Sequence, residues 1–259
     1  MAALVPAGYR LIEVEETAST NAACLEAAKA SDPGNLWIRA DRQVAGRGSR
    51  GRSWVSAPGN LFTSLLLVDP APVQSLSNLT FVAALAVREA LAEVATLHQQ
   101  SANIALKWPN DVLLSGRKVS GILLESHEIQ AESSKRRSVI VGIGVNCVSH
   151  PDDTLHDATD LATEGFAIPA RDMFALIAAS VDNWLKKWDR GNGFLDIRRH
   201  WLDHAHGVSE PIHVRFADRQ ISGIFENIDT MGQLELRCDD GSLVAISTAD
   251  IFFSQPGSD

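Results

Sequence analysis

Two segments of this chain, 61–68 and 138–145, consist almost wholly of apolar or small residues. A short run of this kind, without polar alternation, is typical of a strand that is covered on both faces. Between them, residues 77–97 carry apolar side chains at helical spacing. We therefore expect a mixed α and β domain around a buried sheet. The 45% hydrophobic content and the lack of repeats exclude disordered, collagen-like and coiled-coil classes.

Shorter patterns predict the other elements of this domain. Strands are predicted at 10–14, 36–40, 104–107, 111–114 and 118–125, and the turn at 115–117 makes the last two a hairpin. Helices are predicted at 22–30, 171–188 and 193–204. The polar stretches 42–59 and 126–137 are expected to be loops.

The sequence changes in character near residue 209. Short alternating segments at 212–216, 221–228, 233–237 and 244–246 predict antiparallel strands separated by tight turns. About 50 residues of this kind form a small barrel or sandwich close to the lower size limit for independent folding. We expect an α+β domain with a mixed sheet over residues 1–207 and a small β domain over residues 208–259.

Charge and cysteine content restrict the function and the compartment. The net charge of −9 argues against bulk binding to nucleic acid or to an anionic membrane. The three cysteines form no CxxC pair, which suits a reducing compartment. The chain opens without a signal-peptide pattern and has no apolar run of the roughly 20 residues that a membrane helix needs. The sequence therefore predicts a cytoplasmic protein.

The strongest local motif is the segment 46–52, Gly-Arg-Gly-Ser-Arg-Gly-Arg. Its glycines let the backbone approach a ligand closely, and its arginines offer forked donors to phosphate or carboxylate. A solvated basic loop or an RNA-contacting segment would have the same composition. The GxxxxGK[ST] spacing of a Walker loop is missing.

Four further segments carry polar or small residues where a ligand could bind. Lys107, at a strand end before Trp-Pro-Asn-Asp, could be a fixed cation, although this segment is also ordinary turn chemistry. Gly121 lies inside a strand, where a glycine marks either a bulge or the close approach of a ligand. Asn146 ends the second buried strand and could contact a base or cap its own turn. The segment 19–21, Ser-Thr-Asn, could cap a helix or contact a polar ligand.

Together and in this order, these segments resemble the biotin protein ligases. The matching residues are 19–21, 43–52 with Trp54, 107–111, 118–123 and 142–146. The small terminal β domain also suits that family, where it is a Src-homology-3-like barrel. The resemblance thus covers essentially the whole chain and implies a catalytic domain of the biotin/lipoate ligase type.

The resemblance implies a two-step acyl transfer. The biotin carboxylate attacks the α-phosphate of MgATP to give biotinyl-5′-AMP and pyrophosphate, and a lysine of a biotin carboxyl carrier domain then displaces AMP. ATP and Mg²⁺ are expected with biotin as substrate, without a permanently bound cofactor and without a protein metal site. The expected partner is the carrier domain of a biotin-dependent carboxylase, and the expected state is a monomer or a weak homodimer.

The resemblance also assigns roles to residues. Lys107 and Arg47 are the expected catalytic residues. The expected biotin contacts are Ser19, Thr20, Asn21, Gln43, Gly46, Arg47, Gly48, Ser49, Lys107 and Gly121. The expected nucleotide contacts are Arg50, Arg52, Trp54, Lys118 and Asn146.

One departure and two alternatives remain at this point. Many family loops read Gly-Arg-Gly-Arg, whereas Ser49 takes the fourth position here, so either Arg50 replaces that arginine or the adenylate is held differently. Only 18 residues precede Ser19, and we therefore expect a monofunctional ligase without a DNA-binding domain. A lipoate or octanoate ligase or transferase shares the fold, and a non-catalytic RNA-binding module is the rival from another class.

Overall fold

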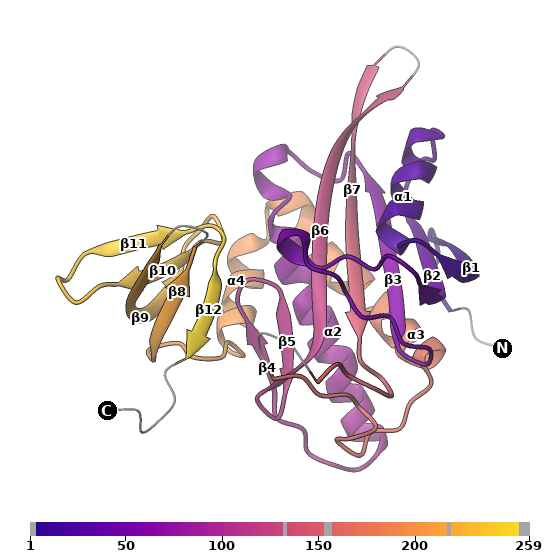
Figure 1. Ribbon diagram of the computed structural model, residues 1–259. Coiled ribbons are helices and arrows are strands. Elements are labelled where there is room, and N and C mark those ends of the chain that lie inside the picture. The colour runs from indigo at the N-terminus through magenta and orange to yellow at the C-terminus, as the bar shows by residue number, and fades with distance from the viewer. Residues whose placement is uncertain (1–3, 132–133, 153–156, 217–218, 254–259) are drawn as a thin grey trace.

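A computed structural model describes residues 4–131, 134–152, 157–216 and 219–253. Within these residues the chain forms two sheets and four α-helices (Figure 1). The strands of the larger sheet are β1 (Arg10–Thr17), β2 (Leu36–Gln43), β3 (Leu61–Val68), β4 (Ile104–Lys107), β5 (Asp111–Leu114), β6 (Arg117–Ala131) and β7 (Ser134–Val145). The helices are α1 (Thr20–Lys29), α2 (Asn78–Leu97), α3 (Ala170–Trp188) and α4 (Phe194–Leu202).

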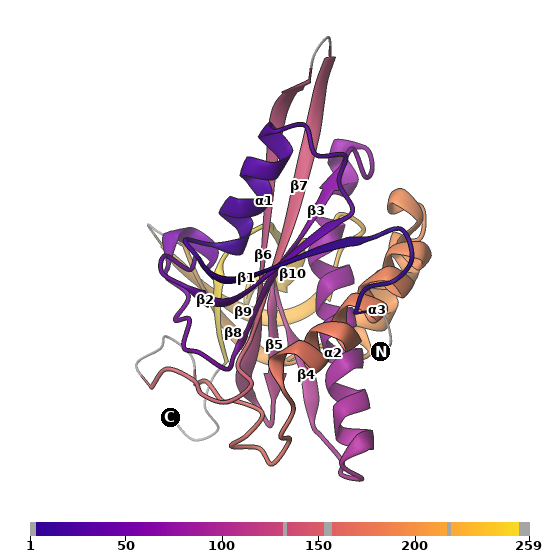
Figure 2. The ribbon, with the colours of Figure 1, turned by 90° about the vertical axis from the view of Figure 1, so that its right-hand side faces the viewer.

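The larger sheet is mixed, with the strand order β1-β2-β3-β7-β6-β5-β4. Strands β1 and β2 are parallel because α1 connects them as a crossover helix, and the other described pairs are antiparallel. Figure 2 shows α1 on one face of the sheet and α2 and α3 on the other. Strand β3, inside the sheet, is buried along almost its whole length because both faces are covered, as its apolar sequence predicts.

The main core lies between the sheet and helices α2 and α3. Helix α2 is buried on most sides, which its apolar residues at helical spacing explain. The same continuous cluster of buried side chains reaches α4 and the second sheet, where the Phe81 ring packs edge-on against Phe194 and Trp201. The two sheets therefore share one hydrophobic core.

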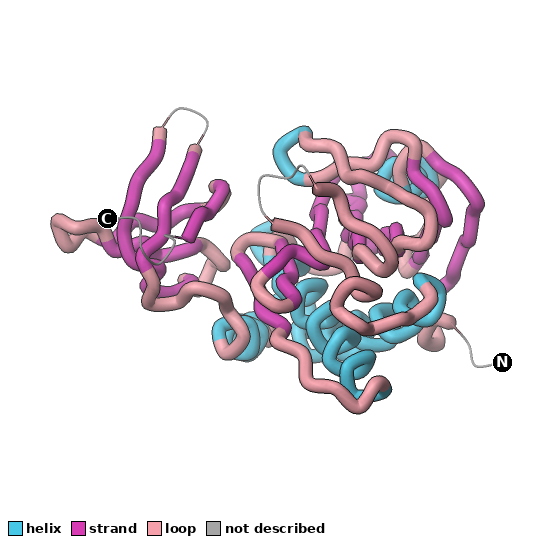
Figure 3. The backbone as a smooth tube through the Cα atoms, turned by 60° about the horizontal axis from the view of Figure 1, so that its bottom comes forward, coloured by secondary structure: helices cyan, strands magenta, loops and turns pink. Residues whose placement is uncertain are grey.

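The second sheet is antiparallel and has the strand order β11-β10-β9-β8-β12. Its strands are β8 (Pro211–Arg215), β9 (Gln220–Ile228), β10 (Leu234–Arg237), β11 (Leu243–Ile246) and β12 (Asp250–Phe253). It lies beside the larger sheet (Figure 3), next to α4 (Figure 1). Trp108 Nε1 donates to the carbonyl of Gly232, and Arg198 donates to Ile228 and Asn227 across the junction. The expected mixed sheet with a small terminal β domain is confirmed.

Two sequence-based predictions about elements are wrong. Residues 126–137 were expected to form a loop, but β6 continues to Ala131 and β7 begins at Ser134, so most of this stretch forms a long two-stranded arm (Figure 1). Strand β12 was not predicted; it pairs with β8 from Asp250 opposite Arg215 to Phe253 opposite Ile212. The predicted hairpin at 115–117 is confirmed. Among the described residues, no helix is long and apolar enough to cross a membrane.

Candidate active site

A cavity of about 410 Å³ lies between the start of α1, the loop after β2 and the strands β6 and β7. It brings together segments that are more than 100 residues apart in sequence. Of the predicted site residues, the following line it: Ser19, Thr20, Asn21, Gln43, Arg47, Gly48, Ser49, Arg52, Trp54, Lys118, Gly121 and Asn146. The sequence motifs therefore converge on one cavity.

One end of the cavity is a network of buried polar side chains. The Thr20 backbone N–H donates to Gln43 Oε1 at 2.8 Å, and the Thr20 hydroxyl lies 3.2 Å from the same oxygen. Ser64 Oγ lies 2.7 Å from Thr20 Oγ1 and 2.5 Å from Asn21 Oδ1. Buried polar groups held in this way keep a fixed orientation and can discriminate a polar ligand by its donors and acceptors.

The segment 19–21 is not used as a side-chain cap. Ser19 precedes α1 in an extended conformation and makes no side-chain capping hydrogen bond, and its side chain is buried in the cavity wall. Asn21 Nδ2 instead donates to Glu125 Oε2 at 2.8 Å. The geometry thus favours the ligand-contact interpretation of this segment over the capping one.

Two glycines make room for the Trp54 ring. Gly121 and Gly144 lie opposite each other on β6 and β7, and a Cβ on either one would come within 2.8 Å of the indole. The Lys118 ammonium lies 5.5 Å from the centroid of the same ring. The β-bulge is at the neighbouring Val119, which has no partner in the register between β5 and β6. Gly121 is therefore required for close packing of Trp54 on the cavity floor.

A second cavity, of about 300 Å³, adjoins the first between the two sheets. Ser49 and Arg52 line both cavities, whereas Lys107 and Arg50 line only the second. Lys107 is 7% exposed and its Nζ lies 5.5 Å from the centroid of Phe253 in β12. Burial lowers the pKa of Lys107 to about 8, opposed by the nearby carboxylate of Asp111. Lys107 is therefore a desolvated cation in the wall of the second cavity.

The three arginines of the glycine-rich loop pair with two carboxylates, one on each sheet. Arg47 Nη2 donates to Glu125 Oε2 at 2.7 Å, at the wall of the first cavity. Arg50, with φ 58°, turns away and pairs with Asp250 of β12 at 2.7 Å. Arg52 Nη2 lies 3.1 Å from Ser49 Oγ and 3.3 Å from Asp250 Oδ1. The side chain that faces the first cavity beside Ser49 is thus that of Arg52.

Three predicted residues lie outside the first cavity. Arg50 and Lys107 line the second cavity. Gly46 packs behind the wall, where a Cβ would come 2.7 Å from Ser56 Oγ and 3.0 Å from Gln43 Nε2. Asn146 lines the cavity, but its Nδ2 donates to the carbonyl of Thr159 at 3.0 Å, so at least part of this amide holds its own loop.

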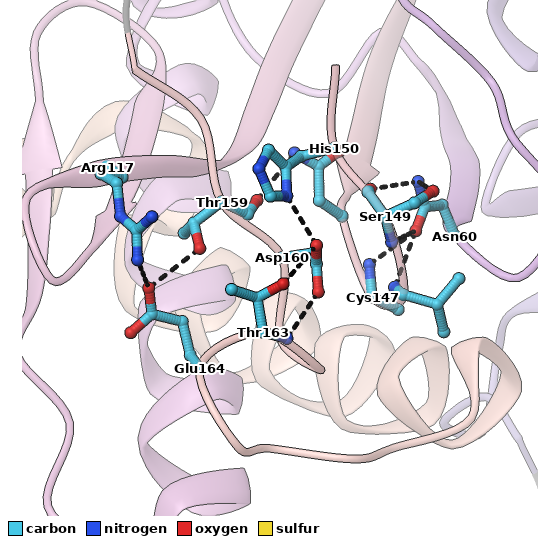
Figure 4. Close-up of polar contacts among 11 residues, drawn as sticks. Asn60, Arg117, Cys147, Ser149, His150, Thr159, Asp160, Thr163 and Glu164 are labelled. Carbon is cyan, nitrogen blue, oxygen red and sulfur yellow. Dashed lines mark hydrogen bonds and ion pairs between the residues drawn. The ribbon is translucent and has the colours of Figure 1, made fainter. Parts of the chain in front are cut away.

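Pro151 and Ala158, which follow β7, also line the first cavity. Figure 4 shows the polar contacts made by residues close to them in sequence. Asn60 Oδ1 accepts the backbone N–H groups of Cys147 and Val148 at 2.8 and 2.9 Å. Asp160 accepts from His150 Nδ1 at 2.6 Å and from Thr163 N at 2.7 Å. Burial would raise the pKa of Asp160, but these hydrogen bonds outweigh it and lower the pKa. An ionised Asp160 therefore anchors this wall.

Sequence reasoning missed four polar residues that hold the site. Ser64 and Asn60 support the cavity from β3 and from the turn before it, Glu125 joins Asn21 to Arg47, and Asp250 joins Arg50 to the second sheet. Only Glu125 carried a local signal, because a carboxylate follows the apolar strand segment directly. The described residues contain no group of three or more His, Cys, Asp or Glu side chains that could hold a metal ion.

Comparisons with known proteins agree with this geometry. The model of the biotin/lipoate A/B protein ligase family matches residues 14–146, and that of the biotin protein ligase C-terminal domain matches residues 210–254. A biotin–[acetyl-CoA-carboxylase] ligase of Paracoccus denitrificans is 39% identical, over 92% of this chain and 98% of that protein. The bifunctional ligase/repressor BirA of Bacillus subtilis is 33% identical, over 94% of this chain and 74% of that protein.

A solved structure extends the match to three dimensions. The biotin protein ligase of Aquifex aeolicus in complex with biotin and ATP superimposes with a TM-score of 0.77 at 26% identity, over 95% of this chain and 99% of that one. The antiparallel second sheet is consistent with the Src-homology-3-like domain expected at this place. The sequence motifs, the fold and the relatives agree, and the chain belongs to the biotin/lipoate A/B protein ligase family, on its biotin protein ligase branch.

Proposed function

We propose that this protein is an ATP-dependent biotin ligase. It would join the biotin carboxylate to AMP, with release of pyrophosphate, and then transfer biotin to a lysine of a carboxyl carrier domain. The observation that carries this proposal is the polarity of the first cavity, which has a neutral hydrogen-bonding end and a cationic end. A small polar head group and an anionic nucleotide need these two environments side by side.

Biotin would occupy the end formed by α1 and β2. The Thr20, Asn21 and Gln43 side chains are held by one another and by Ser64, and they offer donors and acceptors of fixed orientation. A ureido group has both donors and acceptors, and an acid that lacks this group leaves the buried partners unpaired. This end is therefore proposed to select biotin over lipoate.

ATP would occupy the end near Lys118, Arg52 and Trp54. Bringing a carboxylate to a triphosphate brings like charges together, so cations must lie on both sides of the reacting atoms. Lys118 and Arg52 line the first cavity, and Lys107 approaches from the second. We propose that Lys107 stabilises the charge that develops at the α-phosphate, and that the Gly46–Arg52 loop excludes water from the mixed anhydride.

Mg²⁺ is proposed to enter with the nucleotide. Asp111 has one carboxylate oxygen 2.5 Å from Lys118 Nζ, without the geometry of a hydrogen bond at that oxygen. In nucleotide sites Mg²⁺ typically binds one or two carboxylates together with phosphate oxygens and water. Because Asp111 is already paired with Lys118, we propose that phosphate oxygens and water hold this ion without a dedicated protein metal site. When bound, Mg²⁺ neutralises part of the phosphate charge.

The organisation and setting of the enzyme are proposed as follows. Residues 1–207 form the catalytic domain and 208–259 the small β domain, supported by the start of β8 at Pro211. Cys24, Cys147 and Cys238 are free, which supports action in the cytoplasm. The partner is the carrier domain of a biotin-dependent carboxylase, and the enzyme acts as a monomer or a weak homodimer.

Transfer to a carrier domain tests the proposal. The protein is incubated with biotin, MgATP and a purified biotin carboxyl carrier domain, and intact masses are measured. We expect the carrier to gain one biotinyl group, and a carrier whose acceptor lysine is changed to alanine to gain none. A carrier that is unchanged by a folded enzyme, or one modified equally with lipoate, would contradict the proposal.

A further inference from the structure

Glu125 connects two parts of the cavity wall. This residue lies on β6 opposite Ile140 of β7, and its side chain is 19% exposed. Its Oε2 accepts from Asn21 Nδ2 at 2.8 Å and from Arg47 Nη2 at 2.7 Å. Asn21 belongs to the first turn of α1 and Arg47 to the glycine-rich loop, so one carboxylate oxygen ties the loop to the helix.

The Asn21 side of this connection is rigid. Asn21 is 3% exposed, and its Oδ1 lies 2.5 Å from the hydroxyl of Ser64 on β3. The Asn21 side chain packs on Gly142 of β7, where a Cβ would leave no room for it. A chain of contacts therefore runs from Ser64 through Asn21 and Glu125 to Arg47, from the buried sheet to the loop.

The positive charge of Arg47 is balanced by the carboxylate of Glu125. The other cations of the site have different environments: Lys107 is desolvated, and Arg50 and Arg52 pair with Asp250 on the second sheet. Arg47 pairs with Glu125, which contacts the polar, neutral end of the cavity. A guanidinium that is held by a carboxylate on the biotin side is poorly placed to neutralise phosphate on the other side.

We infer that Glu125 is a positioning residue for biotin recognition and that Arg47 acts through it. The Glu125 carboxylate fixes the Asn21 amide and fastens the first residues of the glycine-rich loop over the biotin end of the cavity. Arg47 is then an anchor of the loop and not a cation of the adenylation step, unlike the role that the family resemblance suggested. This inference rests on the proposed function.

A double-mutant cycle with Glu125→Ala and Arg47→Ala tests the inference. Biotin-dependent ATP–pyrophosphate exchange is measured for the wild type, both single variants and the double variant, with KM determined separately for biotin and for ATP. For each single variant we expect a rise of about tenfold in the KM for biotin, the scale of losing a charge-assisted hydrogen bond, with the KM for ATP unchanged. The double variant should be no worse than the poorer single variant.

Two further variants separate positioning from folding. Glu125→Gln keeps an acceptor oxygen and should recover part of the biotin affinity. Glu128→Gln is the matched control, because Glu128 lies on the same strand and pairs with Lys135 on the arm, away from the cavity. It should leave both KM values unchanged. Thermal unfolding midpoints show which variants are folded. Among the folded variants, the KM values for biotin show whether Glu125 positions the site.

The outcomes that overturn the inference are distinct from failure of the proposed function. Multiplicative effects of the two substitutions would show that Arg47 does not act through Glu125. An Arg47→Ala defect confined to kcat and the KM for ATP would show that Arg47 serves the nucleotide directly. Either result overturns the inference while leaving the ligase proposal intact. A wild type without biotin-dependent exchange would overturn both.

Discussion

At the residue scale, the site is defined by which charges are paired and which are not. Four cations of the site have a carboxylate oxygen within 3.3 Å; they are Lys118, Arg47, Arg50 and Arg52. Lys107 is buried near the Phe253 ring. The carboxylates of Asp111 and Asp250 act on it by coulombic attraction. A cation that is desolvated before the substrate arrives interacts strongly with developing negative charge. We therefore propose Lys107 as the residue most directly tied to the chemistry.

Lys107→Ala should slow adenylate formation about a hundredfold, the usual scale for removing one preorganised charge from an active site. Single-turnover formation of biotinyl-5′-AMP measures this step without the transfer reaction. Lys187→Ala is a suitable control, because Lys187 stacks on Trp184 of α3, on the other face of the sheet. Near-normal kinetics for Lys107→Ala would remove Lys107 from the mechanism.

The pH dependence of the activity follows from the burial of Lys107. With a pKa of about 8, Lys107 is an ammonium below that pH and becomes neutral above it. The kcat/KM for biotin should therefore fall as the pH rises through about 8 in the wild type. An arginine stays protonated in this range, so Lys107→Arg should show no such fall. An identical fall in both proteins would assign the titration to another group.

At the element scale, the glycine-rich loop has Ser49 where many family loops have an arginine, and its conformation bears on whether Arg50 replaces that arginine. Arg50 sits at the tip of the loop in a left-handed conformation and reaches the second sheet, whereas Arg52 folds back onto Ser49. The Arg50 side chain is thus engaged with the second sheet, and we expect that it does not replace the missing fourth-position arginine. Arg52 Nη2 lies 3.1 Å from the hydroxyl of Ser49, the residue at that fourth position.

Arg50→Gly should leave the release rate of biotinyl-5′-AMP within about threefold of the wild type, because it removes a partly exposed ion pair and glycine accepts this backbone conformation. Arg52→Ala should release the adenylate faster than Arg50→Gly. The rates can be measured by trapping released adenylate with a rapid chemical quench. Faster escape from Arg50→Gly than from Arg52→Ala would show that Arg50 covers the adenylate.

Local sequence patterns predict the elements that pack in the hydrophobic core. They do not predict structure that depends on contacts between residues distant in sequence. The buried strand β3 has the predicted bounds, because continuous burial requires a continuous apolar sequence. The β6–β7 arm was missed because its outer residues, such as Glu128 and Lys135, are polar and gain their structure from pairing with each other. The ion pairs Arg47–Glu125 and Arg50–Asp250 join residues 78 and 200 positions apart, which no local pattern reveals.

At the scale of the whole molecule, the two sheets are coupled by one core and by Asp250. The buried side chains of the second sheet belong to the same cluster as those beneath the larger sheet. Asp250 of β12 reaches both Arg50 and Arg52 of the glycine-rich loop. The small sheet alone is near the lower size limit for stable folding, so its stability should depend on this junction.

Phe225→Ala tests this coupling. Phe225 is 1% exposed on β9, and its truncation should destabilise the protein by about 3–5 kcal/mol. All six tryptophans precede residue 208, so their fluorescence reports only the larger part of the molecule. We expect the fluorescence-detected unfolding midpoint to fall in this variant, whereas Leu243→Ala, at an exposed position of β11, should leave it unchanged. An unshifted midpoint for Phe225→Ala would show that the two sheets unfold independently.

The central claim is that the cavity activates biotin by adenylation. Isotope exchange between pyrophosphate and ATP reports this half-reaction without any acceptor protein, and it is measured with biotin, with lipoate and with neither acid. The account predicts exchange with biotin alone. Exchange with lipoate alone would place the protein among the lipoate ligases, and no exchange in a folded sample containing Mg²⁺ would contradict the assignment of the cavity to adenylation.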